Sequence, residues 1–389
     1  MTRRILLFIL IFAFGITAGY FVVSKFWPNK KLEKDINLTS LFGPQKEVVG
    51  FLPYWLLSKA QTDYSKYITQ LSYFSLTVSP DGTIEQYTAP GESEPGYLAL
   101  KRGKADPFLN SAKANGVNLS LTVFNGNDDQ IGQILSDPTK NADNLVGSVA
   151  PIMQQYGFTD LNLDIEQVSD ASPSARANFV NFTKEVKNQL VARKLGTLTL
   201  DMTAISFVKD TNLSDPKALA QIADKIILMA YDYHYSGSYV TGPVAPGEGA
   251  GVVSEFDTES AVEKALEIMP ASKLILGIPL YGYEWETIND TPRSAVIPHT
   301  GLIISNQRAE NFLASCATCS AQFDDTDKEV HVIYKDQETG TYHQIFYPDG
   351  QSTGYKVSLA NNNSLGGIAV WALGYEGQTI LGPLSSYGH

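Results

Sequence analysis

The chain contains the stretch FTDLNLDIEQ, residues 158–167, in which polar and aliphatic residues alternate. With a period of two, Asn162, Asp164 and Glu166 point to one face of a strand, and aliphatic side chains point to the other. Such alternation is typical of a sheet with one wet face. In a parallel barrel covered by helices, the polar face would instead line the interior, where grouped carboxylates are costly to bury and their pKa values are perturbed. The cluster therefore indicates a functional site.

Seven other segments have the composition of strands, with helical segments between most of them. Strands are expected at residues 48–55, 71–78, 117–124, 198–204, 225–232, 273–282 and 366–371. Helices are expected at residues 107–115, 128–155, 174–193, 216–223, 258–268 and 352–360. Eight strands alternating with helices predict an α/β fold, a (β/α)8 TIM barrel. A doubly wound open sheet is the alternative, but no phosphate-binding glycine loop follows the first strand.

The other segments complete the expected domain organisation. Residues 5–23 are almost uninterruptedly apolar after Arg3 and Arg4, and as a helix they span about 28 Å, close to the hydrocarbon core of about 30 Å. This predicts a membrane anchor in residues 1–24, with a cleaved signal peptide as the alternative. We then expect a polar linker (25–47), the first part of the barrel (48–285), a small α+β insertion with a hairpin (286–349) and the last helix and strand (350–389).

Charge and cysteine content limit the classes of partner. The first 34 residues hold six Lys or Arg and one Glu, which leaves a net charge of −17 on the rest of a chain whose total is −12. Such an acidic domain is a poor binder of nucleic acid. Cys316 and Cys319, the two cysteines, offer too few ligands for a zinc site and lack a thioredoxin-like context, so a local disulfide or two free thiols is expected.

Residues 158–167 resemble the DGxDxDxE signature of family 18 glycoside hydrolases, the chitinase family. Asp164 and Glu166 match its last two acidic positions, whereas Thr159, Asp160 and Asn162 stand where the signature has Asp, Gly and Asp. The N-x-D-x-E variant is similar to that of the spore-cortex and peptidoglycan-associated N-acetylglucosaminidase branch. Further segments resemble the family at successive strand ends: MAYD (229–232), GPVAP (242–246), IPLYG (278–282) and GGIAVWALGYE (366–376).

The resemblance implies retaining hydrolysis assisted by the 2-acetamido group of the substrate. Glu166 would be the acid and base, Asp164 would orient the acetamido N–H, and Tyr231 would donate a hydrogen bond to its carbonyl oxygen. Trp371 would form the floor of the pocket, although packing of the barrel core is an equal alternative for it. Asn162, Met229, Asp232 and Tyr281 complete the expected substrate-binding set, and Asp201 is a further candidate for the polar network. No metal or organic cofactor is implied.

We therefore expect an extracytoplasmic, membrane-anchored glycosidase that cleaves β-1,4 bonds in N-acetylglucosamine-containing glycans. Peptidoglycan is the preferred substrate, with chitin or chito-oligosaccharides as the alternative. A barrel that binds carbohydrate without cleaving it is the other class of function, and secretion after signal cleavage is the other location.

Overall fold

Eight parallel strands close into a barrel in the computed structural model, which describes residues 46–252 and 255–388. In chain order the strands are β1 (Glu47–Pro53), β2 (Gln70–Thr77), β5 (Asn118–Asn125), β6 (Asp160–Ile165), β7 (Thr197–Thr203), β8 (Lys225–Met229), β9 (Leu274–Pro279) and β15 (Gly367–Trp371). Each strand pairs with the next in this order, and β15 pairs with β1. The predicted (β/α)8 barrel is confirmed.

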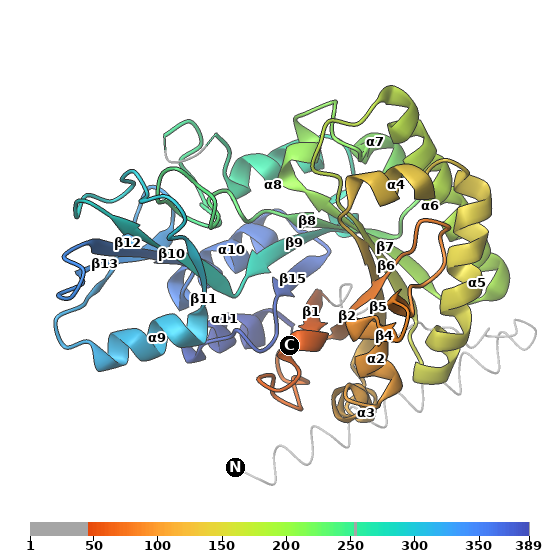
Figure 1. Ribbon diagram of the computed structural model, residues 1–389, viewed down its shortest axis with the longest axis horizontal. Helices are drawn as coiled ribbons and strands as arrows, with labels where there is room; N and C mark the ends of the chain where they lie inside the picture. Colours follow the sequence, from red (N-terminus) through yellow and green to blue (C-terminus); the bar gives the residue numbers. More distant parts are fainter. Residues whose placement is uncertain (1–45, 253–254, 389) are drawn as a thin grey trace, which may run out of the picture. The chain divides into compact units, whose positions relative to one another are not determined.

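Helices lie along the outside of the barrel, as α4 to α7 do beside β5 to β8 in Figure 1. In chain order the helices of the barrel are α2 (Pro95–Lys101), α3 (Asp106–Ala114), α4 (Asp128–Ile134), α5 (Pro138–Tyr156), α6 (Pro173–Arg193), α7 (Pro216–Leu219), α8 (Thr258–Leu266), α10 (Gly350–Asn362) and α11 (Gln378–Gly388). The single helix expected at residues 128–155 is two helices. Asp137 caps the second through the backbone N–H of Lys140, and Pro138 occupies its first turn.

Strand β6 separates two environments. Its outward side chains Leu161, Leu163 and Ile165 belong to the large hydrophobic core between strands and helices. Its inward side chains are polar, and the lowest of them, Asp160, accepts hydrogen bonds from Ser120 (2.7 Å) and from Thr197 (2.5 Å) and Thr199 (3.0 Å). These three hydroxyl groups satisfy a carboxylate that is otherwise costly to bury.

A five-stranded antiparallel sheet is inserted between β9 and β15. Its strands are β10 (Tyr281–Thr287), β11 (Leu302–Ser305), β12 (Ala321–Asp324), β13 (Glu329–Lys335) and β14 (Tyr342–Tyr347), in the order β11, β10, β14, β13, β12. Helix α9 (Asn306–Ser315) packs on one face, as the residues shared by their apolar cluster show. The hairpin expected in the insertion is β13 and β14. A disulfide joins Cys316 and Cys319, which was one of the two alternatives expected.

The strand expected at residues 273–282 is divided in two. Strand β9 ends at Pro279 and β10 begins at Tyr281, so only Leu280 separates the barrel from the inserted sheet. The expected boundary at residue 286 consequently falls inside β10. Pro279 and Gly282 flank the transition, but apolar and aromatic residues continue across it, so hydrophobicity alone reads the two strands as one.

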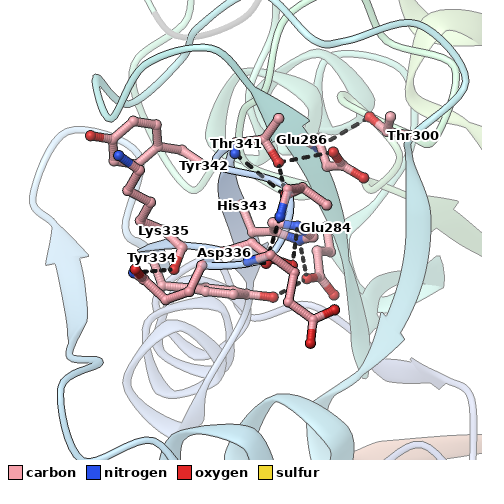
Figure 2. A network of polar contacts seen from close by, with 12 residues as sticks. Glu284, Glu286, Thr300, Tyr334, Lys335, Asp336, Thr341, Tyr342 and His343 are labelled. Atoms are coloured by element: carbon pink, nitrogen blue, oxygen red, sulfur yellow. Dashed lines mark hydrogen bonds and ion pairs between the residues drawn. The ribbon is translucent and has the colours of Figure 1, made fainter.

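Buried and partly buried polar side chains tie the strands of the insertion together, as Figure 2 shows. Glu284 of β10 accepts hydrogen bonds from the hydroxyl of Tyr334 (2.7 Å) and from Nδ1 of His343 (2.8 Å). The hydroxyl of Thr341 donates to Glu286 (3.0 Å). Strand β10 is therefore fixed by side chains to β13 and β14, as well as by the backbone ladder to β14.

The expected membrane anchor and linker lie outside the described residues. In residues 46–252 and 255–388, no helix combines the length and the apolar character needed to cross a bilayer.

Two glycines that precede neighbouring strands differ in what a side chain would meet. Gly157 (φ 76°) ends α5, and a Cβ there would have only Lys113 Cδ within 4 Å, at 3.7 Å. At Gly196 (φ 120°) a Cβ would lie 1.9 Å from the carbonyl oxygen of Thr159, which accepts the hydrogen bond of Thr197 N.

We expect Gly157→Ala to lower the free energy of unfolding by about 1 kcal/mol through left-handed backbone strain alone. Gly196→Ala should lower it by about 3 kcal/mol, because the added methyl group also forces β6 and β7 apart. Chemical denaturation followed by circular dichroism measures both values. Equal decreases in the free energy of unfolding for the two variants would contradict the expected clash at Gly196.

Candidate active site

The carboxyl ends of the barrel strands surround a cavity of about 410 Å³. It is lined by Phe51, Tyr54, Trp55, Phe74, Ser75, Thr77, Glu94, Phe124, Asp164, Glu166, Asp201, Met229, Tyr231, Asp232 and Trp371. Six of the eight side chains proposed from sequence as site residues are among them. The other two, Asn162 and Tyr281, lie behind the wall of the cavity and contact residues that line it.

Asn162 is fully buried below the cavity and donates a hydrogen bond from Nδ2 to Oδ1 of Asp201 at 2.9 Å. Asp201 comes from β7, next to β6 in the barrel. The amide therefore positions one carboxylate of the cavity and adds no negative charge of its own.

Asp164 and Glu166 are inward residues of β6 and its carboxyl end, as the alternation predicts. Burial raises the pKa of Asp164 well above its usual value, and the charges of Glu166 and Asp201 raise it further. Burial and the charge of Asp232 also raise the pKa of Glu166, whereas its contact with Asp164 lowers it. Oδ1 of Asp164 is buried without a hydrogen-bond partner among the described residues. This favours a carboxyl cluster that retains protons, so that Glu166 can act as an acid near neutral pH.

Tyr231 and Asp232 follow β8, and the structure turns the backbone sharply at Asp232 (φ 60°). Asp232 accepts hydrogen bonds from the hydroxyls of Tyr281 (2.6 Å) and Tyr283 (2.9 Å), both on β10 of the insertion. Burial raises the pKa of Tyr231 well above its usual value, and the surrounding carboxylates act in the same direction. Its hydroxyl group therefore stays protonated and is a hydrogen-bond donor.

Aromatic rings form the floor of the cavity. Trp371, the last residue of β15, packs edge-on against Phe74 (ring centroids 4.5 Å apart) and Phe51 (5.7 Å). Trp55 packs edge-on against Phe74 (5.7 Å) and Trp371 (6.3 Å). Such a surface suits the apolar face of a sugar ring, and it makes the packing and binding interpretations of Trp371 compatible.

Phe51, Phe74 and Glu94 were not predicted as site residues. Phe51 and Phe74 are in expected strands, and Phe51 lies inside the barrel beside Val49, two residues before it on β1, so alternation along this strand is a signal for Phe51. Glu94 is buried at the start of α2, where it caps the backbone N–H of Tyr97. It follows the short hairpin of β3 (Tyr87–Ala89) and β4 (Glu92–Ser93), which no periodicity announced.

No group of three or more His, Cys, Asp or Glu side chains is arranged to hold a metal ion in the part of the chain that the structure describes. Asp164, Asp201 and Asp232 line the cavity from β6, β7 and the segment after β8, and Glu166 directly follows β6. Such a set of carboxylates suits proton transfer and charge stabilisation.

A closed parallel barrel with carboxylates and aromatic rings gathered at the carboxyl ends of its strands is the arrangement of a glycoside hydrolase. Residues 47–376 match the family model described as glycosyl hydrolases family 18. The chain belongs to this family and is a family 18 glycosidase.

Several relatives are similar over most of the chain. The cortical fragment-lytic enzyme of Bacillus subtilis is 26% identical over 321 residues, which are 82% of this chain and 67% of that protein. A class V chitinase of Arabidopsis thaliana is 30% identical over 265 residues, which are 64% of this chain and 67% of that protein. The crystal structure of the Ostrinia furnacalis group IV chitinase in complex with allosamidin has a TM-score of 0.74 at 20% identity, covering 88% of this chain and 98% of that one. At that identity the structural likeness shows the fold alone.

Asp201→Asn tests the electrostatics of the cavity. Burial raises the pKa of Asp201 well above its usual value. Its contribution to stability is therefore complete below the ordinary pKa and is lost as pH rises through the folded-state pKa. Asparagine keeps the acceptor for Asn162 and does not ionise. We expect the free energy of unfolding of the variant, relative to the unmodified protein, to increase from about pH 4 to about pH 8.

Chemical denaturation at a series of pH values measures this difference. Asp170→Asn is the matched control, because the hydrogen bond from Lys209 lowers the pKa of this exposed carboxylate and gives the opposite sign. A difference for Asp201→Asn that does not change with pH would show that the cavity does not hold this carboxyl group protonated.

Proposed function

We propose that the protein is a retaining, substrate-assisted glycosidase that cleaves β-1,4 bonds in N-acetylglucosamine-containing glycans, with peptidoglycan as its preferred substrate. The observation that carries this proposal is the meeting of Asp164, Glu166 and Tyr231 around one aromatic-floored cavity. The first two have raised pKa values and the third is a protonated donor. These are the three groups that acetamido participation needs.

In the first step Glu166 donates its proton to the glycosidic oxygen as the bond to the anomeric carbon breaks. The acetamido oxygen of the same sugar attacks the anomeric carbon and forms an oxazolinium ion. Asp164 accepts the acetamido N–H in its ionised form, which the positive charge developing on that group favours over the protonated form. Tyr231 donates a hydrogen bond to the acetamido oxygen and holds it beneath the anomeric carbon, so that little reorganisation is needed.

In the second step Glu166, now a carboxylate, removes a proton from water. The water oxygen bonds to the anomeric carbon, and the bond to the acetamido oxygen breaks. Two displacements at one carbon return the original β configuration, and the proton returns Glu166 to its starting state. The negative charge of Asp232 supports this exchange because it favours the protonated form of Glu166 between turnovers.

Two cavities border Glu166, which suits an acid that must reach the bond between two sugars. A second cavity of about 200 Å³ shares Glu166, Asp201 and Met229 with the larger one and extends over the ends of β6 and β7. We assign the larger, aromatic-floored cavity to the sugar that carries the participating acetamido group. The smaller cavity is assigned to the leaving group.

The preference for peptidoglycan rests on relatives and on the Asn162 variant of the motif. Cortical fragment-lytic enzymes of Bacillus subtilis and Bacillus cereus are both 26% identical to the chain over 82% of its length. Chitin or chito-oligosaccharide is the alternative, supported by the class V chitinase of Arabidopsis thaliana at 30% identity. A barrel that only binds glycans is the other alternative, and the presence of Glu166 with Asp164 and Tyr231 argues against it.

Glu166→Gln should lower kcat about a hundredfold or more, because the amide has no proton to donate, while leaving glycan affinity close to that of the unmodified protein. Release of reducing ends from purified peptidoglycan and from chitin oligosaccharides measures activity. Calorimetric titration with an N-acetylglucosamine tetramer measures affinity.

Glu185→Gln, an isosteric change on α6, is the matched control and should keep full activity. The substrate cleaved faster by the unmodified chain decides between peptidoglycan and chitin. An unmodified chain that binds these glycans and releases no reducing ends would replace this proposal with the carbohydrate-binding alternative.

We also propose that residues 5–23 attach the catalytic domain to a membrane on its outer side, on the basis of their length and apolar character. The full chain should sediment with membranes and resist extraction at alkaline pH, whereas a chain that lacks residues 1–24 should stay in the supernatant. If the gene for the full chain yields a shortened protein in the supernatant, with the first residues removed, the segment is instead a cleaved signal peptide.

A further inference from the structure

The segment after β8 returns to the end of that strand at residues 242–246. Val244 and Ala245 are fully buried and form an apolar cluster with Tyr281, Tyr283, Trp285 and Phe346. Tyr231 packs against this cluster. The carbonyl oxygen of Val244 accepts the backbone N–H of Tyr233 at 3.0 Å, next to the sharp turn at Asp232. Residues 242–246 therefore contact the segment that carries Tyr231 and Asp232.

One carboxylate of the insertion holds this segment. Glu329, the first residue of β13, is 1% exposed. Its Oε1 accepts the backbone N–H of Val244 at 2.7 Å, and its Oε2 accepts that of Ala245 at 3.0 Å. A carboxylate that accepts from two consecutive N–H groups fixes both their distance and their orientation.

Charged residues around Glu329 are buried to an unusual degree. Lys356 of α10 is fully buried, and its Nζ has no hydrogen-bond partner among the described residues. Asp327 accepts a hydrogen bond from the backbone N–H of Glu329 (2.9 Å) and does not neutralise its charge. Asp327 instead forms an ion pair with Arg293 (2.6 Å), which also pairs with Asp324 (2.7 Å). Burial raises the pKa of Glu329 to about 7, and the charge of Lys356 opposes this.

Stability alone does not account for this arrangement. Buried charges are commonly replaced by apolar side chains at no loss of stability, because desolvation offsets their attraction. Here the charged group does what an apolar side chain cannot do, since it orients two backbone N–H groups. The burial of the Glu329 carboxylate, despite its cost in desolvation, therefore indicates that the positions of these two N–H groups matter.

We propose that Glu329 is a positioning residue of the active site: it fixes Val244 and Ala245, and through them it keeps Tyr231 and Asp232 in their catalytic geometry. The proposal rests on the function proposed above. Because small displacements of catalytic groups are sufficient to slow a reaction strongly, loss of this clamp should act on turnover.

The test compares Glu329→Gln with Glu310→Gln in the full chain. Glu310 of α9 also accepts two backbone N–H groups of the barrel, those of Gln378 (2.7 Å) and Thr379 (3.2 Å), but it lines neither active-site cavity. Both substitutions thus remove one carboxylate clamp between insertion and barrel. We expect Glu329→Gln to lower kcat about tenfold with little change in KM, and Glu310→Gln to leave both unchanged. A fluorogenic N-acetylchito-oligosaccharide is the substrate.

A second variant separates positioning from stability. Glu329→Gln combined with Lys356→Met removes both buried charges, so the melting temperature should recover relative to Glu329→Gln alone. The kcat should stay low, because the two N–H groups still lack a bidentate acceptor. Recovery of kcat together with the melting temperature, or a kcat of Glu329→Gln within twofold of the unmodified value, would overturn the proposal.

Amide hydrogen exchange of residues 242–247 gives a readout that does not depend on activity. Exchange should be faster in Glu329→Gln than in the unmodified chain and unchanged in Glu310→Gln. An unmodified chain that cleaves no glycan would overturn the proposed function, and the positioning role would fall with it. An active chain whose kcat and exchange are the same in Glu329→Gln would overturn the positioning role alone.

Discussion

The active site depends on carboxylates gathered in one cavity at the carboxyl ends of the barrel strands. Asp164, Glu166, Asp201 and Asp232 line this cavity, and desolvation is the first cause of the raised pKa of each. Fuller hydration of the cavity would weaken the interactions among these groups and lower the pKa of the acid proposed for the reaction. The closed barrel and its aromatic floor are therefore conditions of the chemistry. The same desolvation lowers the free energy of unfolding, and the hydrophobic core between strands and helices must offset this loss.

Two parts of the fold build the site jointly. The barrel supplies the carboxylates and Trp371, whereas the inserted sheet supplies the two tyrosine hydroxyls that hold Asp232 and the carboxylate that holds residues 242–246. Because only Leu280 separates β9 from β10, the insertion has little freedom to move relative to the strand that carries it. The short connection at Leu280 thus helps to hold the insertion in a fixed position against Asp232 and residues 242–246.

The sequence predicted the barrel and the polar face of β6 because both depend on local periodicity, and the strand ends with Tyr231, Asp232 and Trp371 because motifs marked them. It did not predict that Asn162 lies below the cavity and bonds Asp201, since alternation gives a face and not a depth. It also read β9 and β10 as one strand, because apolar residues continue across Leu280. Glu94 and Glu329 act through loops and backbone contacts that leave no periodic signal. What could be predicted from sequence was local, and what could not be predicted was tertiary.

The two faces of β6 have a consequence for how this protein can change over time. Leu161 and Leu163 face the helices and serve folding, while Asp164 on the same strand and Glu166 directly after it face the cavity. Substitutions on the outer face act mainly on stability and leave the cavity groups in place, whereas substitutions on the inner face change the cavity groups directly. Selection can therefore act on durability through one face of a six-residue strand and on substrate preference mainly through the other.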